Sequence, residues 1–308
     1  MSAARPPAPR APGPGSRVAL VSPGGPVDEA RVERAMADCR EFGFVPVLGD
    51  AARSRDGYLA GPDAGRAGDL GRAFRDPSVD AIWALRGGYG AMRLLAGLDV
   101  EPMRRRPRPF IGFSDNTAIH LALATEGIVS FHGPHPGALT DPFARDGLRR
   151  VLCEPRPAGV LPPAPDGEPV LTLVPGVAEG RLAGGNLSIL AALCGTTWAL
   201  RASGCIVVIE DVGEATYRID RALMQLVLSG ALRGATGIAF GRFTDRPASD
   251  NDRVLEDVLA EIARPLGVPV VSGMPIGHID AQWTLPLGVR ARLDADRGRL
   301  EILEPAVG

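Results

Sequence analysis

Ser114 lies where an apolar run ends and a helical pattern begins, at the centre of the segment IGFSDNT. A serine at a strand-to-helix turn projects its hydroxyl from the carboxyl edge of a sheet, and the first N–H groups of the helix have no intrahelical partners. This is the geometry of a nucleophile elbow, although the segment lacks the closing glycine of G-x-S-x-G. The same residue types are good helix caps. The segment alone therefore leaves two interpretations open, nucleophile and cap.

The absence of lysine narrows the chemistry that Ser114 could perform. All 34 basic residues of the chain are arginines. This excludes a P-loop lysine, a Schiff-base lysine and a Ser–Lys dyad. A base for Ser114 would therefore have to be one of the four histidines of the chain.

The four histidines differ in their sequence surroundings. His278 is a candidate base because it lies in the glycine- and proline-flanked loop GMPIGHIDAQ. Catalytic and binding residues are often found in such exposed loops. His120 falls inside the helical pattern after Ser114 and is expected to pack. His132 and His135 form H-G-P-H, a spacing that suggests a metal site, but the sequence offers no evident third ligand.

A histidine base also needs a carboxylate that orients its ring. Glu210 is a candidate because it follows directly on the apolar run 205–209. A strand that simply returns to solvent would show the same pattern, so this alternative stays open. Asp115 and Asp280 are the next candidates for this carboxylate. Asp115 can instead stabilise the start of a helix, and Asp280 is only two residues from His278, too close in sequence to orient its ring easily.

These residues depend on elements that position them. Up to residue 155, apolar strand patterns alternate with helical patterns, which predicts a parallel sheet covered by helices. The glycine-rich strand ends SPGGP (22–26) and RGGYG (86–90) would then lie at the same sheet edge as Ser114. After residue 175, the pattern predicts a smaller mixed α/β domain, with a glycine-rich turn and helix at 180–195 and a strand pair near the end.

The predicted organisation therefore has four parts. They are a disordered Pro/Ala/Arg-rich tail (1–15), an N-terminal α/β domain with the nucleophile (16–155), a proline-rich linker (156–175), and a C-terminal domain with the triad acid and base (176–308).

Composition limits the partners. The net charge is −2, and no basic stripe interleaves with the few aromatic residues, so no nucleic-acid partner is expected. No apolar run approaches the roughly 18 residues that a membrane span requires. The first residues lack the apolar core of a signal peptide, so a cytoplasmic protein is expected. The four cysteines are scattered and are expected to be reduced packing residues.

Six motifs in sequence order resemble the LD-carboxypeptidase family, serine peptidases that include murein tetrapeptide carboxypeptidases and microcin C self-immunity proteins. The resemblance covers residues from about 16 to 305. The motifs are RGGYG (86–90), IGFSDNT (111–117), FHGP (131–134), GRLAGGNLS (180–188), IEDVGEATYRIDR (209–221) and GHID…TLPLG (277–288).

The resemblance implies specific roles. Ser114 would be the nucleophile, His278 the base and Glu210 the acid of a triad, and the N–H groups of Asp115 and Gly88 would form the oxyanion hole. It also implies no metal and no organic cofactor, a homodimer, and a small murein-type peptide substrate from which terminal D-alanine is released.

The sequence leaves several alternatives for the residues that bind the substrate and for the substrate itself. A terminal carboxylate calls for a cation, for which Arg86, Arg181 and Arg218 are candidates, and Asn186 could bind substrate or cap a helix. One alternative is an immunity-type hydrolase of peptidyl or aminoacyl-sulfamoyl nucleotides, in which Trp198 or Trp283 could stack on the base. A remote alternative is a non-catalytic nucleotide- or sugar-phosphate-binding protein.

Overall fold

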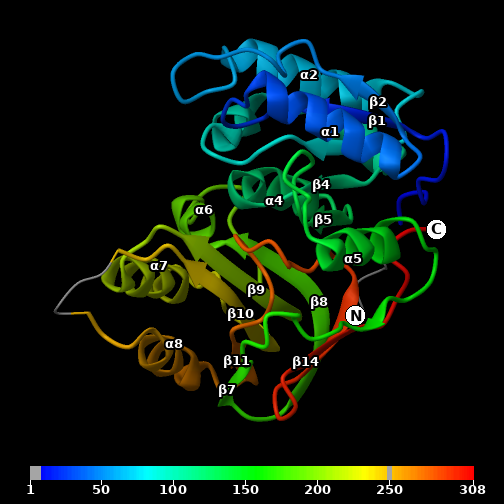
Figure 1. The fold of residues 1–308 in the computed structure, drawn as a ribbon. Helices are drawn as coiled ribbons and strands as arrows, with labels where there is room; N and C mark the ends of the chain where they lie inside the picture. The colour runs from blue at the N-terminus through cyan, green and yellow to red at the C-terminus, as the bar shows by residue number, and fades with distance from the viewer. Residues whose placement is uncertain (1–7, 248–251) are drawn as a thin grey trace. The chain divides into compact units, whose positions relative to one another are not determined.

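The computed structural model describes residues 8–247 and 252–308. The chain divides into two compact units. The first contains residues 1–156, 284–288 and 305–308, and the second contains residues 157–283 and 289–304. Each unit is built around its own sheet, which confirms the expected parallel-sheet α/β domain and the smaller mixed α/β domain (Figure 1).

The first sheet has six strands in the order β12-β5-β4-β3-β1-β2. The five N-terminal strands are parallel and β12 is antiparallel to β5. β3 and β4 are entirely buried, and so are four of the five residues of β1, as expected for a sheet covered on both faces. The strands are β1 (Arg17–Val21), β2 (Val45–Leu48), β3 (Ala81–Ala84), β4 (Phe110–Gly112), β5 (Ser130–His132) and β12 (Leu285–Leu287).

Helices connect these strands, and their starts follow from local chemistry. The Asp28 side chain accepts the Arg31 N–H at 2.7 Å and begins the first helix. One of these helices, a 3-10 helix, begins after Gly90, a residue with φ of 132°. The helices are α1 (Glu29–Glu41), α2 (Asp63–Arg75), η1 (Ala91–Gly97), α3 (Glu101–Arg105), η2 (Ser114–Asn116), α4 (Thr117–Thr125) and α5 (Pro142–Leu152).

The second sheet has eight strands in the order β6-β14-β13-β8-β9-β10-β11-β7. The central strands β8 to β11 are parallel, and antiparallel strands flank them, including the predicted strand pair β13 and β14. α6, α7 and α8 lie on one side of this sheet in Figure 1. The strands are β6 (Gly159–Val160), β7 (Leu171–Val174), β8 (Val177–Asn186), β9 (Cys205–Val212), β10 (Gly237–Thr244), β11 (Val270–Ser272), β13 (Arg290–Asp294) and β14 (Arg299–Ile302). The helices are α6 (Leu187–Ala192), α7 (Thr216–Leu228), α8 (Leu255–Ala263) and η3 (Arg264–Leu266).

The glycine-rich segment 180–186 is a strand and not the expected turn. It forms most of β8, which pairs with β9 and β13. A Cβ on Gly180 would lie 2.5 Å from Thr236 Oγ1, and a Cβ on Gly184 would lie 2.1 Å from the Val208 carbonyl oxygen. The glycines therefore permit close packing in this strand rather than a change of direction.

Two expected boundaries also need correction. Residues 156–175 are not a plain linker, because they contribute β6 and β7 to the second sheet. The segment 284–288 contributes β12 to the first sheet, so the C-terminal part of the chain does not form one separate domain. The three short strands of these two segments are placed by pairing with residues that are distant in sequence.

The part of the predicted tail that the structure describes, residues 8–15, is ordered. Gly308 donates to the Pro9 carbonyl at 2.9 Å, and Ala11 donates to the Gly308 carbonyl at 3.1 Å. Pro9 and Pro12 are buried. Proline-rich composition predicted disorder, but two short backbone contacts with the other terminus hold this segment; the rest of the predicted tail, residues 1–7, lies outside the described residues.

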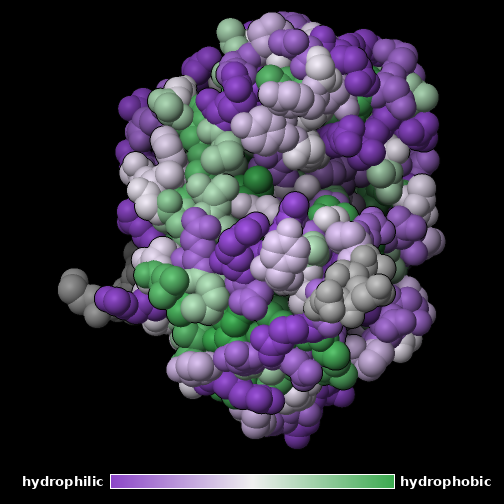
Figure 2. All heavy atoms as spheres, turned by 90° about the vertical axis from the view of Figure 1, so that its left-hand side faces the viewer, coloured by the Kyte–Doolittle hydropathy of each residue, from purple (hydrophilic) through white to green (hydrophobic). Residues whose placement is uncertain are grey.

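The surface is mixed in character. Figure 2 shows one face on which hydrophilic side chains are interleaved with smaller groups of hydrophobic ones. Within the described part of the chain, no helix combines the length and the apolar composition needed to cross a membrane.

Candidate active site

Ser114 occupies a strained turn between β4 and α4. Its φ is 61°, and Ser114 and Asp245 are the two non-glycine residues with positive φ among the described residues. A left-handed conformation costs a residue with a Cβ roughly 1–2 kcal/mol, so such a residue persists only where the surroundings impose it. This is the backbone geometry of a nucleophile elbow, formed here without the closing glycine.

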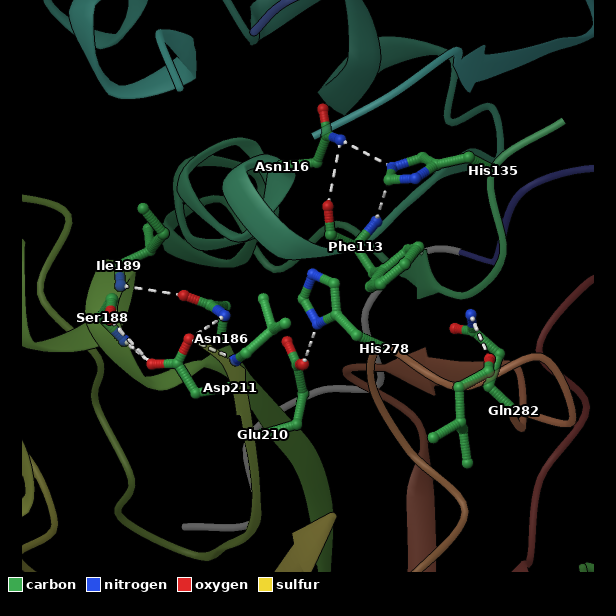
Figure 3. A network of polar contacts seen from close by, with 12 residues as sticks. Phe113, Asn116, His135, Asn186, Ser188, Ile189, Glu210, Asp211, His278 and Gln282 are labelled. Carbon is green, nitrogen blue, oxygen red and sulfur yellow. Dashed lines mark hydrogen bonds and ion pairs between the residues drawn. The ribbon is translucent and has the colours of Figure 1, made fainter. Parts of the chain in front are cut away.

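The residues on either side of Ser114 are held by the side chain of His135 (Figure 3). Nε2 of His135 accepts a hydrogen bond from Asn116 Nδ2 at 3.1 Å and lies 3.4 Å from the Phe113 backbone nitrogen. The His135 ring also stacks on Phe113, with centroids 4.4 Å apart. Asn116 Nδ2 also lies 3.1 Å from each of the carbonyl oxygens of Phe113 and Arg86, so its two N–H bonds are shared among three acceptors. These contacts explain how the strained turn is maintained.

His120 is buried and supports the strand before the elbow, as its expected packing role requires. Its Nε2 lies 2.8 Å from the Gly112 carbonyl, which can only accept, so Nε2 carries the proton. Nδ1 then accepts from Ser130 Oγ at 2.8 Å. Burial lowers the pKa of His120 to about 3, so the ring is neutral at pH 7.

The loop RGGYG lies against Ser114 through Gly87. A Cβ on Gly87 would come within 2.7 Å of Ser114 Cβ and 2.8 Å of Ser114 Oγ. The Gly87 carbonyl accepts from Gly25 N–H at 2.7 Å. Because carbonyl and N–H point in opposite directions in a trans peptide, the N–H of Gly88 points away from Gly25. The two glycine-rich loops predicted to share an edge with Ser114 therefore do so.

The carboxylate of Asp115 is turned into the protein. It is 1% exposed, and its Oδ2 accepts from Ala91 N–H at 2.8 Å. Burial raises the pKa of Asp115, while hydrogen bonds from the Ala91 and Gly90 backbone and the charge of Arg66 oppose this. The side chain thus links the elbow to η1 and is not a partner for a histidine in this unit.

In the second unit, Glu210 and His278 form a buried carboxylate–imidazole pair (Figure 3). His278 Nδ1 lies 2.8 Å from Glu210 Oε2. Glu210 has no exposed surface, whereas 20% of the His278 side chain is exposed. Glu210 therefore does not mark a return of β9 to solvent. A carboxylate on Nδ1 leaves Nε2 as the ring nitrogen that can exchange a proton.

The loop that carries His278 is fixed to the end of β10. Met274 donates to the Phe240 carbonyl at 3.1 Å, and Arg242 donates to the Ile276 carbonyl at 2.9 Å. Gly277 has φ of 110°, and a Cβ there would lie 2.6 Å from Glu210 Oε2. A glycine directly before the histidine therefore allows the loop to approach the carboxylate.

Asp211, the next residue of β9, serves a different network. Its Oδ1 accepts from Asn186 Nδ2 at 2.9 Å, and its Oδ2 accepts from the backbone and hydroxyl of Ser188 at 2.9 and 2.7 Å. Asn186 Oδ1 caps α6 by accepting from Ile189 N–H at 3.3 Å. Of the two roles expected for Asn186, the structure shows the cap. Burial raises the pKa of Asp211.

A cavity of about 300 Å³ opens beside Asp211 in the second unit. Ser188, Asp211, Glu214 and Arg218 are among its lining residues. The lining therefore carries both positive and negative charge. Arg218 and Glu214 form an ion pair there, with Arg218 Nη1 3.5 Å from Glu214 Oε2.

The three candidate arginines occupy different places. Arg86 is exposed and donates to the Pro26 carbonyl at 3.1 Å, in the first unit. Arg181 pairs with Cys205 in the sheet, whereas Asn186 pairs with Glu210. Five residues of strand separate these positions, roughly 16 Å at about 3.3 Å per residue. Arg181 is therefore remote from the Glu210 end of β9.

Two other expectations can be compared with the structure. Trp283 is 4% exposed and donates to the Pro162 carbonyl at 2.9 Å, so it packs and is not available for stacking on a ligand. Among residues 8–247 and 252–308, no cluster of three His, Cys, Asp or Glu side chains could hold a metal ion. His135 of the H-G-P-H motif instead uses Nε2 to accept hydrogen bonds.

Sequence reasoning missed the contacts of Asn116 and His135 at the elbow, and it missed the burial of Arg66 on α2. Arg66 had a readable signal, because it is four residues before Leu70 and eight before Phe74 and so lies on the buried face of α2. Asn116 and His135 had none, since their contacts depend on the return of the chain through β5.

The comparisons with known proteins agree with this architecture. A model of the LD-carboxypeptidase N-terminal domain matches residues 18–133, and a model of the C-terminal domain matches residues 179–293. A Streptomyces coelicolor protein classed as a carboxypeptidase is 43% identical over 96% of this chain and 95% of its own.

The chain is also similar to a second relative and to a solved structure. The murein tetrapeptide carboxypeptidase of Pseudomonas aeruginosa is 36% identical over 92% of this chain and 94% of its own. The microcin C7 self-immunity protein, solved in complex with aspartyl sulfamoyl adenosine, is 25% identical with a TM-score of 0.88, over 98% of this chain and 100% of its own.

Proposed function

Because the chain belongs to the LD-carboxypeptidase family and is therefore a serine-type hydrolase, we propose that Ser114, His278 and Glu210 form its catalytic triad. The observation that carries this proposal is the buried Glu210 carboxylate at 2.8 Å from Nδ1 of His278. The strained backbone of Ser114, with φ of 61°, supports it independently. A non-catalytic binding protein needs neither feature.

The proposed mechanism uses Nε2 of His278, the ring nitrogen that does not face Glu210. His278 Nε2 takes the Ser114 proton as Oγ attacks the scissile carbonyl, while Glu210 stabilises the resulting imidazolium. The N–H groups of Asp115 and Gly88 donate to the oxyanion, and each such donor is worth roughly 3–4 kcal/mol. His278 then protonates the leaving amine, and water hydrolyses the acyl-enzyme. In the second step His278 takes a proton from that water and returns it to Ser114 Oγ, which restores the free enzyme.

For the substrate, we propose a murein tetrapeptide from which terminal D-alanine is released. The similarity to the Pseudomonas aeruginosa murein tetrapeptide carboxypeptidase supports this choice. The terminal carboxylate needs a cation, and the exposed guanidinium of Arg86 meets this need from the RGGYG loop. We also propose a hydrogen bond to the substrate from Asn186, whose side chain caps α6.

A second candidate is hydrolysis of a peptidyl- or aminoacyl-sulfamoyl nucleotide. The similarity to the microcin C7 self-immunity protein with aspartyl sulfamoyl adenosine favours it. The same triad would serve both substrates. With Trp283 packed against Pro162, Trp198 is the remaining candidate for stacking on the nucleotide base.

The test is release of D-alanine from an L,D-linked tetrapeptide by the purified chain and by Ser114→Ala. Loss of the nucleophile should lower turnover by roughly 10³-fold or more with an unchanged melting temperature. Aminoacyl-sulfamoyl adenosine is assayed in parallel. Faster hydrolysis of the nucleotide would favour the second candidate, and near-normal turnover by Ser114→Ala would contradict the triad.

We also propose a homodimer, which the resemblance to the family implies, and a cytoplasmic enzyme, which the composition of the sequence predicts. Light scattering coupled to gel filtration tests the first, and fractionation of cells that express the chain tests the second. Neither property enters the proposed chemistry.

A further inference from the structure

Arg66 is a buried cation within the first unit. It lies on α2, and its side chain has no exposed surface. Burial of a charged side chain costs several kcal/mol unless charge and hydrogen-bond partners compensate. The position of Arg66 on the same helix face as Leu70 and Phe74 would suit an apolar side chain, so the guanidinium calls for an explanation.

The guanidinium joins two glycine-rich loops. Its Nη1 donates to the carbonyls of Pro23 and Gly90, the latter at 2.9 Å. Its Nε donates to the Gly61 carbonyl at 3.3 Å, and its Nη2 pairs with the Asp63 carboxylate. Pro23 belongs to the segment 22–26 and Gly90 to the segment 86–90. One planar group therefore connects the SPGGP and RGGYG loops.

Both loops contact the nucleophile turn next to the atoms that Arg66 holds. Beside Pro23, a Cβ on Gly24 would lie 2.5 Å from Asp115 Oδ2. Directly after Gly90, Ala91 donates to the same oxygen at 2.8 Å. The loops also bind each other through Gly25 N–H and the Gly87 carbonyl at 2.7 Å.

The local sequence accommodates the guanidinium at Gly90. A Cβ there would lie 2.6 Å from Arg66 Nη1, and the φ of Gly90 is 132°. The last glycine of RGGYG thus admits the arginine while its carbonyl accepts from it. Asp63 completes the arrangement, because it also binds Arg93 Nη2 at 2.8 Å and so anchors α2 to η1.

We propose that Arg66 is a positioning residue for the oxyanion hole, which it preorganises by holding the Pro23 and Gly90 carbonyls. The inference rests on the proposed function, in which Gly88 and Asp115 supply the oxyanion donors. Arg66 acts on those donors through the loops and has no role in binding the ground-state substrate. Its loss should therefore lower kcat and leave KM nearly unchanged.

The experiment compares Arg66→Met, Arg66→Lys and Arg75→Met in the full chain. Methionine keeps much of the length but donates no hydrogen bond, and lysine keeps the charge without the planar fork. Arg75 is an exposed residue of the same helix and provides the matched control. Release of D-alanine from an L,D-linked tetrapeptide gives kcat and KM, and circular dichroism on heating gives the folded fraction.

For Arg66→Met we expect a fall in kcat of about 10²-fold per folded molecule, since a misplacement near 1 Å can cost that much. Arg66→Lys should lie between Arg66→Met and the unchanged chain, and Arg75→Met should match the unchanged chain. If Arg66→Met does not fold, the kcat of Arg66→Lys tests the proposal: a reduced kcat supports the positioning role and an unchanged kcat contradicts it. A purely structural role would reduce the folded fraction and leave kcat per folded molecule intact.

Two failures are distinguishable. Normal kcat in folded Arg66→Lys and Arg66→Met, or a loss confined to KM, would overturn the positioning role while the proposed function stands. If the unchanged chain releases no D-alanine, or Ser114→Ala releases it normally, the proposed function fails and the positioning role fails with it.

Discussion

His278 Nδ1 lies 2.8 Å from Oε2 of Glu210, a carboxylate with no exposed surface. Burial strengthens this contact, because the local dielectric is low and solvent does not compete for the carboxylate. The relationship fixes which ring nitrogen can act as a base.

Glu210→Gln should lower kcat by roughly 10³–10⁴-fold with little change in KM, because an amide can donate to Nδ1 and so favour the wrong tautomer of His278. The measurement is D-alanine release from an L,D-linked tetrapeptide. Glu179→Gln, which removes the charge of a partly exposed carboxylate on β8 that pairs with Arg290, is the control. A kcat within tenfold of the unchanged chain would argue against Glu210 as the triad acid.

Gly277→Ala should abolish most activity, because its Cβ would lie 2.6 Å from Glu210 Oε2 and displace the His278 loop. The matched control is Gly267→Ala, at a position with φ of 67° and open space around a Cβ. Both variants should lose roughly 1 kcal/mol or more of stability from the left-handed backbone, as thermal unfolding can measure. Equal activity in the two variants would contradict the steric account.

Gly87→Ala tests the approach of the RGGYG loop to the nucleophile. Its Cβ would lie 2.7 Å from Ser114 Cβ and 2.8 Å from Oγ, without a positive φ at this position. We expect a kcat reduced by about 10²-fold, the cost of a misplacement near 1 Å. Gly97→Ala, where a Cβ meets open space, should leave kcat unchanged in the same assay. Unchanged kcat and KM for Gly87→Ala would show that the loop can shift away from Ser114 without loss of activity.

The lowered pKa of His120 predicts that the stability of the folded chain depends on pH. Its pKa is about 3 in the folded chain, against 6.5 for an ordinary histidine, so the unfolded chain binds one more proton between these values. Stability should therefore fall as pH drops from 6.5 toward 3, by up to about 1.4 kcal/mol per pH unit from this group. Urea titrations of the unchanged chain and of His120→Gln check this, and identical pH slopes would count against it.

The sequence alone was enough to predict the alternating parallel-sheet unit, because apolar runs and helical periodicity are local signals. It also identified Ser114, Glu210 and His278 as candidates, since residue types at strand ends and in glycine-flanked loops can be read directly. The strand nature of 180–186 could not be read in this way. Its glycines are explained by Thr236 and Val208, which approach them from other strands.

Only the tertiary structure decided how the candidates are held. Gly87 against Ser114, His135 on Phe113 and Asn116, and Arg66 between two loops are contacts between residues far apart in sequence. The same holds for β12, which follows the His278 loop but pairs with β5 of the first sheet. Periodicity reports which face of an element is buried, whereas pairing partners and strained dihedrals emerge only when the chain packs.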